Sequence, residues 1–198
     1  MNKQNKKMSP SHAAGLHDEK RRRQLPPEKL IALIRPFAGM ALADIGVGTG
    51  FCSIPLLESV NWQATYYAVD AQAEMLEKFR ERLAGHEHAD AVRMILTPDD
   101  RVDLPDQTVD VAVACSVYHE LPDRARHAVE LRRILKPGGR LVVVDWKSLA
   151  TGEERTVGPP AHHRVDVKEA IAELTAAGFT GIVEHHVFDQ LWALTTEK

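Results

Sequence analysis

A group of glycines after the first strongly apolar stretch is the clearest sign of chemistry in this chain. The stretch 40–45 leads directly into Gly46, Gly48 and Gly50, and a helical pattern begins at Phe51. Glycine reaches left-handed backbone conformations and lets a ligand approach the main chain without a Cβ in the way. The first turn of a following helix offers unpaired N–H groups to a carboxylate or a phosphate. The sequence therefore predicts a ligand-binding loop at this position.

An acidic residue stands where a second contact to such a ligand belongs. Asp70 lies 20 residues beyond Gly50, at the end of the β-branched and aromatic stretch 65–69. A carboxylate there can accept hydrogen bonds from both ribose hydroxyls of an adenosine. Asp70 could equally cap a helix that begins near Ala71. Together with the glycines, it favours an adenosine-containing ligand.

The spacing of the glycines separates the classes of ligand. A dinucleotide-binding loop requires Gly-x-Gly-x-x-Gly, but this chain has Gly-x-Gly-x-Gly, with Phe51 at the position of the last glycine. An NAD(P)-dependent oxidoreductase is therefore the weaker alternative. No Walker lysine follows the loop, and no Gly-x-Ser-x-Gly motif occurs, so a nucleoside triphosphatase and an α/β-hydrolase are disfavoured.

Strand and helix patterns alternate along the chain and must position these residues. Apolar runs predict strands at 40–45, 65–69, 91–96, 109–115, 141–146, 180–188 and 191–196. Helical periodicity predicts helices that begin near Pro26 and at 51–59, 74–83, 124–135 and 167–177, the fourth stopped by the Pro-Gly-Gly at 137–139. This alternation indicates a mostly parallel sheet covered on both faces, with ligands bound at the carboxyl ends of its strands. We expect one domain at 25–198, preceded by a basic and flexible or loosely docked segment at 1–24.

Four segments, in order and at suitable spacing, resemble the class I S-adenosylmethionine-dependent methyltransferases. The resemblance is greatest to the small members near the ubiquinone/menaquinone C-methyltransferase type, and it runs from about Leu25 to the end of the chain. The four segments are Asp44-Ile45-Gly46-Val47-Gly48-Thr49-Gly50, Tyr67-Ala68-Val69-Asp70 with Met75-Leu76, Leu104-Pro105-Asp106-Gln107-Thr108-Val109-Asp110, and Leu135-Lys136-Pro137-Gly138-Gly139-Arg140-Leu141.

The resemblance implies a fold and a cofactor site. The fold would be a Rossmann-like three-layer α/β/α sandwich around a seven-stranded mixed sheet in the order 3-2-1-4-5-7-6. The cofactor would be S-adenosylmethionine, with S-adenosylhomocysteine as its product. The residues that the resemblance places around it are Asp44, Gly46, Gly48 and Gly50 in the loop, Asp70 and Ala71 at the ribose and adenine, Asp99 or Asp100 at the adenine amino group, and Cys115 and Ser116 near the methionine end.

Residues for the methyl acceptor are expected after two later strands. Tyr118 and His119 follow the strand that ends at Cys115, and either could orient or deprotonate an acceptor; they could equally begin the next helix. His163, in the long connection after Trp146, is a second candidate beside His162 and Arg164, although these three could form a solvated turn. Methyl transfer from a sulfonium relies mainly on positioning, so the acceptor is not revealed by a fixed motif.

Composition narrows the remaining choices. The net charge of −3 weighs against a nucleic-acid substrate, and no run approaches the roughly 18 apolar residues of a membrane span. Cys52 and Cys115 do not make a disulfide framework, so we expect a cytoplasmic protein. The sequence has no Cys-x-x-Cys or His-Glu-x-x-His motif, which are typical of metal sites, so we expect no bound metal. We therefore predict a methyltransferase for a small-molecule acceptor, monomeric or homodimeric, with a non-catalytic S-adenosylmethionine-binding regulator as the alternative.

Overall fold

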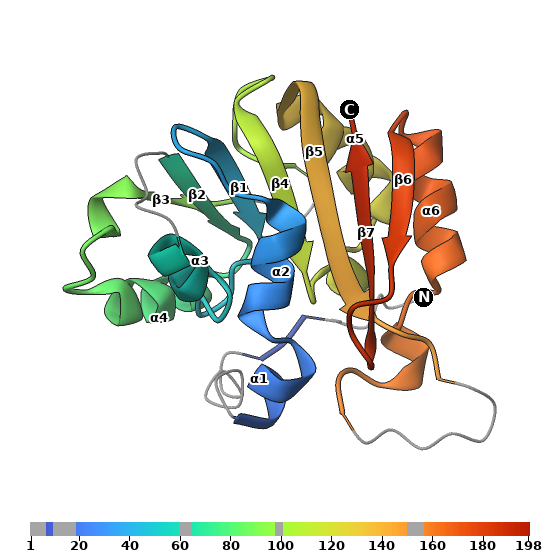
Figure 1. The fold of residues 1–198 in the computed structure, drawn as a ribbon, viewed down its shortest axis with the longest axis horizontal. Coiled ribbons are helices and arrows are strands. Elements are labelled where there is room, and N and C mark those ends of the chain that lie inside the picture. The colour runs from blue at the N-terminus through green and yellow to red at the C-terminus, as the bar shows by residue number, and fades with distance from the viewer. Residues whose placement is uncertain (1–6, 10–18, 60–64, 98–100, 150–156) are drawn as a thin grey trace.

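A seven-stranded sheet forms the centre of the molecule, with helices on both of its faces (Figure 1). The structure is a computed structural model, and it describes residues 7–9, 19–59, 65–97, 101–149 and 157–198. The strands are β1 (Ala41–Ile45), β2 (Thr65–Asp70), β3 (Val92–Leu96), β4 (Val109–Cys115), β5 (Leu135–Trp146), β6 (Thr180–His185) and β7 (Leu191–Glu197). The helices are α1 (Glu19–Gln24), α2 (Pro27–Ile34), α3 (Ser53–Ser59), α4 (Ala73–Leu83), α5 (Arg124–Ile134) and α6 (Val167–Ala176).

The strand order is β3-β2-β1-β4-β5-β7-β6, which confirms the order implied by the family resemblance. The strands from β1 to β5 pair in parallel, whereas β7 is antiparallel to both β5 and β6. Because parallel strands run in one direction, the carboxyl ends of β1, β2, β4 and β5 meet at one edge of the sheet. This edge lies at the bottom of Figure 1, next to α1.

Side chains that alternate along the strands build two separate cores. On one face, buried residues such as Leu42 and Val113 pack with those of α2, α3 and α4. On the other face, residues such as Ala43 and Ala114 pack with α5 and α6. The central strands are therefore apolar on both faces, as expected for a parallel sheet between two layers of helices.

Two elements differ from the sequence-based expectation. Strand β5 begins at Leu135, which pairs with Val109, so the Pro-Gly-Gly that ends the preceding helix lies within the strand rather than ahead of it. Helix α1 lies inside segment 1–24, where the sequence predicted a basic, flexible or loosely docked segment and did not predict a helix. The segment boundary at residue 24 stays a prediction.

The structure contains no candidate membrane span in the parts of the chain that it describes. Its longest helices there, α4 and α5, have 11 residues each, and none is both long and apolar enough to cross a bilayer.

Candidate functional site

The glycine loop between β1 and α3 has the conformation that its sequence predicts. Gly46 and Gly48 adopt left-handed φ angles of 68° and 55°. A Cβ on Gly46 would lie 2.3 Å from Cγ2 of Val117, so this position is closed to every larger residue. The Gly46 and Val47 amides donate to the Val69 carbonyl oxygen at 2.8 and 3.0 Å, which ties the loop to the end of β2.

Asp70, at the end of β2, holds the loop from the other side. Its Oδ2 accepts the Gly48 amide at 2.9 Å, and its Oδ1 accepts the Gln72 amide at 2.9 Å. Burial raises the pKa of Asp70, and the Gly48 and Gln72 amides oppose that shift. Each carboxylate oxygen can accept a further hydrogen bond. Asp70 therefore organises the loop and keeps acceptor capacity for a ligand hydroxyl.

Asp44, at the end of β1, is turned toward the protein. Its Oδ2 accepts hydrogen bonds from the hydroxyls of Ser53 at 2.8 Å and Tyr66 at 2.6 Å. Burial raises its pKa to about 6, although the two hydroxyls oppose the shift. Asp44 thus links β1, β2 and α3 beneath the loop.

These residues border a cavity of about 680 Å³ at the carboxyl ends of the strands, which is within the size range of small-molecule sites. The predicted residues that line it are Asp44, Gly46, Gly48, Asp70, Ala71, Cys115, Ser116, His119 and His163. Two further predicted residues, Asp99 and Asp100, lie outside the described residues.

Gly50 and Tyr118 are the predicted residues that the structure does not bring to this cavity. Gly50 packs against the core, because a Cβ there would lie 2.2 Å from the ring of Phe79. Tyr118 is fully buried, and its hydroxyl donates to Glu173 Oε2 at 2.7 Å while its ring packs edge-on against Trp192. Its phenol therefore connects the turn after β4 to α6 and does not face an acceptor.

His119, the next residue, is turned toward the cavity and held by a buried carboxylate. Its Nδ1 lies 2.7 Å from Asp145 Oδ1, and its backbone amide donates to Asp145 Oδ2 at 2.8 Å. Asp145 is fully buried near the end of β5, where its Oδ1 also accepts the Trp146 amide at 2.7 Å. Three contacts thus fix the carboxylate, which in turn fixes the imidazole ring.

Glu120 adds a second carboxyl group to this wall. Its Oε1 lies 3.7 Å from His119 Nε2, and its Oε2 accepts the Met8 amide at 3.2 Å. Burial raises the pKa of Glu120 to about 7, while His119 and the Met8 amide oppose the shift. This wall of the cavity therefore has a carboxyl group with a pKa near neutral pH.

Ser116 has an unusual backbone conformation and a buried hydroxyl that suit contact with a polar ligand. It has a φ of 56°, which is rare for a residue with a side chain and is often found at functional sites. Its hydroxyl is buried and has no hydrogen-bond partner within the part of the chain that the structure describes. A buried hydroxyl without a partner is costly, so a ligand with a hydrogen-bonding group fits this end of the cavity.

The described residues of the connection between β5 and α6 form the remaining wall, and Arg164 binds the backbone at several of them. The guanidinium donates to the backbone oxygens of Lys147 at 2.8 Å, Pro159 at 3.1 Å and Val157. Arg164 was predicted either to meet an acceptor or to belong to a solvated turn. In the structure, three of its N–H groups donate to carbonyl groups on both sides of the connection.

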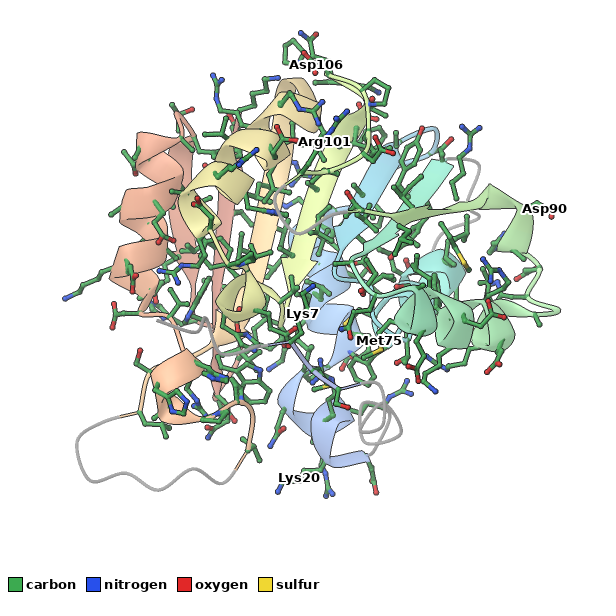
Figure 2. The ribbon with its side chains drawn as sticks, turned by 180° about the vertical axis from the view of Figure 1, so that it is seen from behind. Lys7, Lys20, Met75, Asp90, Arg101 and Asp106 are labelled. Carbon is green, nitrogen blue, oxygen red and sulfur yellow. The ribbon has the colours of Figure 1, made fainter. Side chains whose placement is uncertain are left out.

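The N-terminal segment supplies a wall that sequence reasoning missed. Lys7, Met8, Ser9, Lys20, Arg21 and Gln24 all line the cavity. The Met8 carbonyl accepts from Gln72 Nε2 at 3.2 Å, while its amide binds Glu120. Figure 2 shows Lys20 on α1 at the bottom of the view, with Lys7 and Met75 above it. The cluster of basic residues was the only signal in the sequence, and it does not specify these backbone contacts.

The chemistry of the cavity suits S-adenosylmethionine. Asp70 can accept from ribose hydroxyls, Ser116 offers a hydroxyl, and the volume matches a small-molecule ligand. Among the described residues, no group of three or more His, Cys, Asp or Glu side chains is arranged to hold a metal ion.

Comparison with known proteins also indicates a methyltransferase. The methyltransferase domain family matches residues 43–143. The chain is 26% identical over 118 residues to the ubiquinone/menaquinone biosynthesis C-methyltransferase UbiE of Geobacter sulfurreducens, covering 60% of this chain and 46% of that protein. It is 31% identical over 120 residues to the demethylmenaquinone methyltransferase of Desulfitobacterium hafniense, covering 60% and 47%. The chain thus spans about half the length of these curated relatives.

A solved structure extends the likeness over nearly the whole chain. The SAM-dependent methyltransferase from Aquifex aeolicus superposes with a TM-score of 0.86 at 29% identity, over 96% of this chain and 99% of that one. The family match, the strand order and the cavity agree with one another. The chain belongs to the class I S-adenosylmethionine-dependent methyltransferases.

Proposed function

We propose that this chain methylates a small molecule that loses a proton as it reacts, and that His119 accepts this proton. Bound S-adenosylmethionine supplies an activated methyl group on its sulfonium. Asp44, Gly46, Gly48, Asp70, Ala71, Cys115 and Ser116 are the residues that would hold the cofactor in the described part of the cavity. The observation that carries the proposal is the buried His119–Asp145 pair, with an Nδ1–Oδ1 distance of 2.7 Å.

The pair sets the protonation of the imidazole ring. Asp145 is an acceptor when ionised, so the Nδ1 of His119 carries the hydrogen in this contact, and in the neutral ring Nε2 keeps the lone pair that a general base needs. Nε2 is the atom on the Glu120 side of the ring, at the cavity. A positive charge that forms on the ring is stabilised by the Asp145 carboxylate. This is the arrangement of a general base oriented by an acid.

The apolar side chains around the pair suit a flat, largely apolar acceptor. The residues that form these walls are Leu121, Pro122, Trp146, Val157, Pro159 and Pro160. Apolar walls limit the water around reacting atoms, and this strengthens electrostatic contacts inside a cavity. A hydroxylated aromatic ring combines such a body with an oxygen or carbon atom that loses a proton on methylation. The relatives named for ubiquinone and menaquinone biosynthesis support an acceptor of this kind.

A transfer assay with labelled cofactor tests the proposal. Methyl-labelled S-adenosylmethionine is incubated with the chain and with demethylmenaquinol, simple dihydroxynaphthalenes, amines and thiols. We expect label in a hydroxylated aromatic acceptor. His119→Gln should lower kcat by about 10²- to 10⁴-fold, the usual contribution of a general base, and leave the affinity for S-adenosylhomocysteine nearly unchanged.

The matched control is His186→Gln, because His186 is an exposed histidine at the end of β6, outside the cavity. Full activity of His119→Gln would overturn the role of His119. Tight cofactor binding without transfer to any acceptor would favour the non-catalytic regulator instead.

A further inference from the structure

Helix α1 places one of its arginines at the cavity and leaves the next two in solvent. Arg21, Arg22 and Arg23 are consecutive. Arg21 is partly buried and lines the cavity, whereas Arg22 and Arg23 are exposed and do not. The three arginines of this short helix thus differ in orientation, and among them Arg21 lines the ligand site, as does the preceding Lys20.

The neighbours of Arg21 show where in the cavity its positive charge lies. Its guanidinium carbon lies 5.2 Å from the ring centroid of Phe51, the residue that follows the glycine loop. The pKa of Cys115 is raised by a hydrogen bond with Cys52 and by burial, and the charge of Arg21 opposes this shift. The guanidinium therefore lies near the end of β4, where Cys52 and Cys115 also line the cavity.

The sheet topology indicates which part of the cofactor would lie at this end of the cavity. Strand β1 lies between β2, which ends at Asp70, and β4, which ends at Cys115. A cofactor whose ribose is at Asp70, and which crosses the end of β1, brings its methionine part to Cys115. Lys7 acts at the opposite end, because its charge lowers the pKa of Asp70 against burial.

A carboxylate at the Cys115 end needs a nearby cation. The charge of Asp44 raises the pKa of Cys115, so a buried acid already lies at this end. A second negative group there would be repelled unless a positive charge stood beside it. A guanidinium is suited to this task because its planar fork of N–H groups binds both carboxylate oxygens at once.

We propose that Arg21 binds the carboxylate of the methionine part of S-adenosylmethionine, which makes α1 a part of the cofactor site. The inference rests on the proposed function, since it takes S-adenosylmethionine as the ligand. It assigns a role to the basic N-terminal segment, which the sequence alone left as a lead-in to the domain.

Two ligands that differ at the carboxylate test the role of Arg21. S-adenosylhomocysteine carries the whole amino-acid end, whereas 5′-methylthioadenosine lacks both its carboxylate and its amino group. Isothermal titration calorimetry measures their Kd values for the full chain, for Arg21→Gln and for Arg22→Gln. We expect Arg21→Gln to raise the Kd of S-adenosylhomocysteine by about 10- to 100-fold, the usual range for a charge-assisted hydrogen bond. The Kd of 5′-methylthioadenosine should change by less than about twofold.

The controls separate this role from a structural one. Arg22→Gln removes the same charge from the same helix, so it should change neither Kd. Unchanged binding of 5′-methylthioadenosine shows that the site of Arg21→Gln is intact. Equal weakening of both ligands, or of neither, would overturn the assignment of Arg21 and leave the proposed function standing. A full chain that binds neither ligand would contradict the proposed function, and the role of Arg21 with it.

Discussion

At the scale of single residues, three carboxyl groups of the cavity wall differ in what surrounds them. Asp44 is bound by the hydroxyls of Ser53 and Tyr66 and supports the loop from below. Asp70 is bound by two backbone amides and keeps acceptor capacity for a ligand. Glu120 accepts a backbone amide from the N-terminal segment. The same chemical group is thus a support at Asp44, a proposed cofactor contact at Asp70 and a group with a pKa near neutral pH at Glu120.

Glu120 makes the stability of the chain depend on pH. Its folded pKa of about 7 lies above its ordinary value of 4.5, chiefly because burial disfavours the charge. The stability contributed by the neutral form is complete below pH 4.5 and is lost as the pH rises through 7. Glu120→Gln keeps the neutral shape at every pH. Its free energy of unfolding should therefore rise relative to the unmodified chain between pH 4.5 and 8.5, by at most roughly 3 kcal/mol.

Urea unfolding at pH 4.5 and at pH 8.5 measures this difference. Glu81→Gln, an exposed position on α4, is the matched control and should show no such change between the two pH values. A difference between Glu120→Gln and the unmodified chain that is the same at both pH values would refute the assignment.

The sequence predicted the residues around the loop better than those around the acceptor. The glycines and Asp70 carry a local signal, because their spacing and their positions at strand ends are visible in the sequence. Tyr118 and His119 are adjacent, yet the short turn Tyr118–Glu120 sends one ring into the core and the other to the cavity. The sequence did not pair Asp145 with His119, because their contact spans 26 positions and depends on how β4 and β5 pair.

At the scale of elements, the cavity is enclosed by parts of the chain that are distant in sequence. The Met8 backbone joins Gln72, 64 positions away, to Glu120, 112 positions away. Met8 makes both contacts with main-chain atoms. The type of its side chain therefore does not predict these contacts. This explains why the N-terminal segment could not be placed from its composition. It also shows that the Met8 backbone connects the cavity wall at Gln72 with the cavity wall at Glu120.

The connection between β5 and α6 should depend on Arg164 for its shape. Arg164→Gln removes the guanidinium donors that hold the carbonyls of Lys147, Val157 and Pro159. We expect KM for the acceptor to rise by about 5- to 50-fold, which corresponds to about 1–2 kcal/mol of lost positioning. The Kd of S-adenosylhomocysteine should change by less than about threefold. Steady-state kinetics and calorimetry measure the two quantities.

Lys168→Gln is the matched control, because Lys168 is an exposed cation in the first turn of α6. It should leave both quantities unchanged. An equal loss of cofactor affinity in Arg164→Gln would mean that Arg164 supports the domain as a whole and not the acceptor wall.

At the scale of the whole molecule, the cavity lies where the order of the strands reverses. The chain runs outward from β1 to β3 and then returns to place β4 on the other side of β1. Ligands bind at such reversals in open parallel sheets. Alternating strands and helices predicted the layers and the parallel sheet, because both faces of the central strands are apolar. They did not predict the strand order, which came from the family resemblance, since several orders satisfy the same alternation.

The structure of the chain with S-adenosylhomocysteine bound tests the account most directly. A crystal structure of this complex should place the ribose hydroxyls within about 3 Å of the Asp70 carboxylate, at hydrogen-bond distance. The sulfur should lie on the His119 side of the cavity, and the ligand carboxylate should lie beside Arg21. A ligand in the reverse orientation, with its carboxylate at Asp70, or a ligand outside this cavity would contradict it.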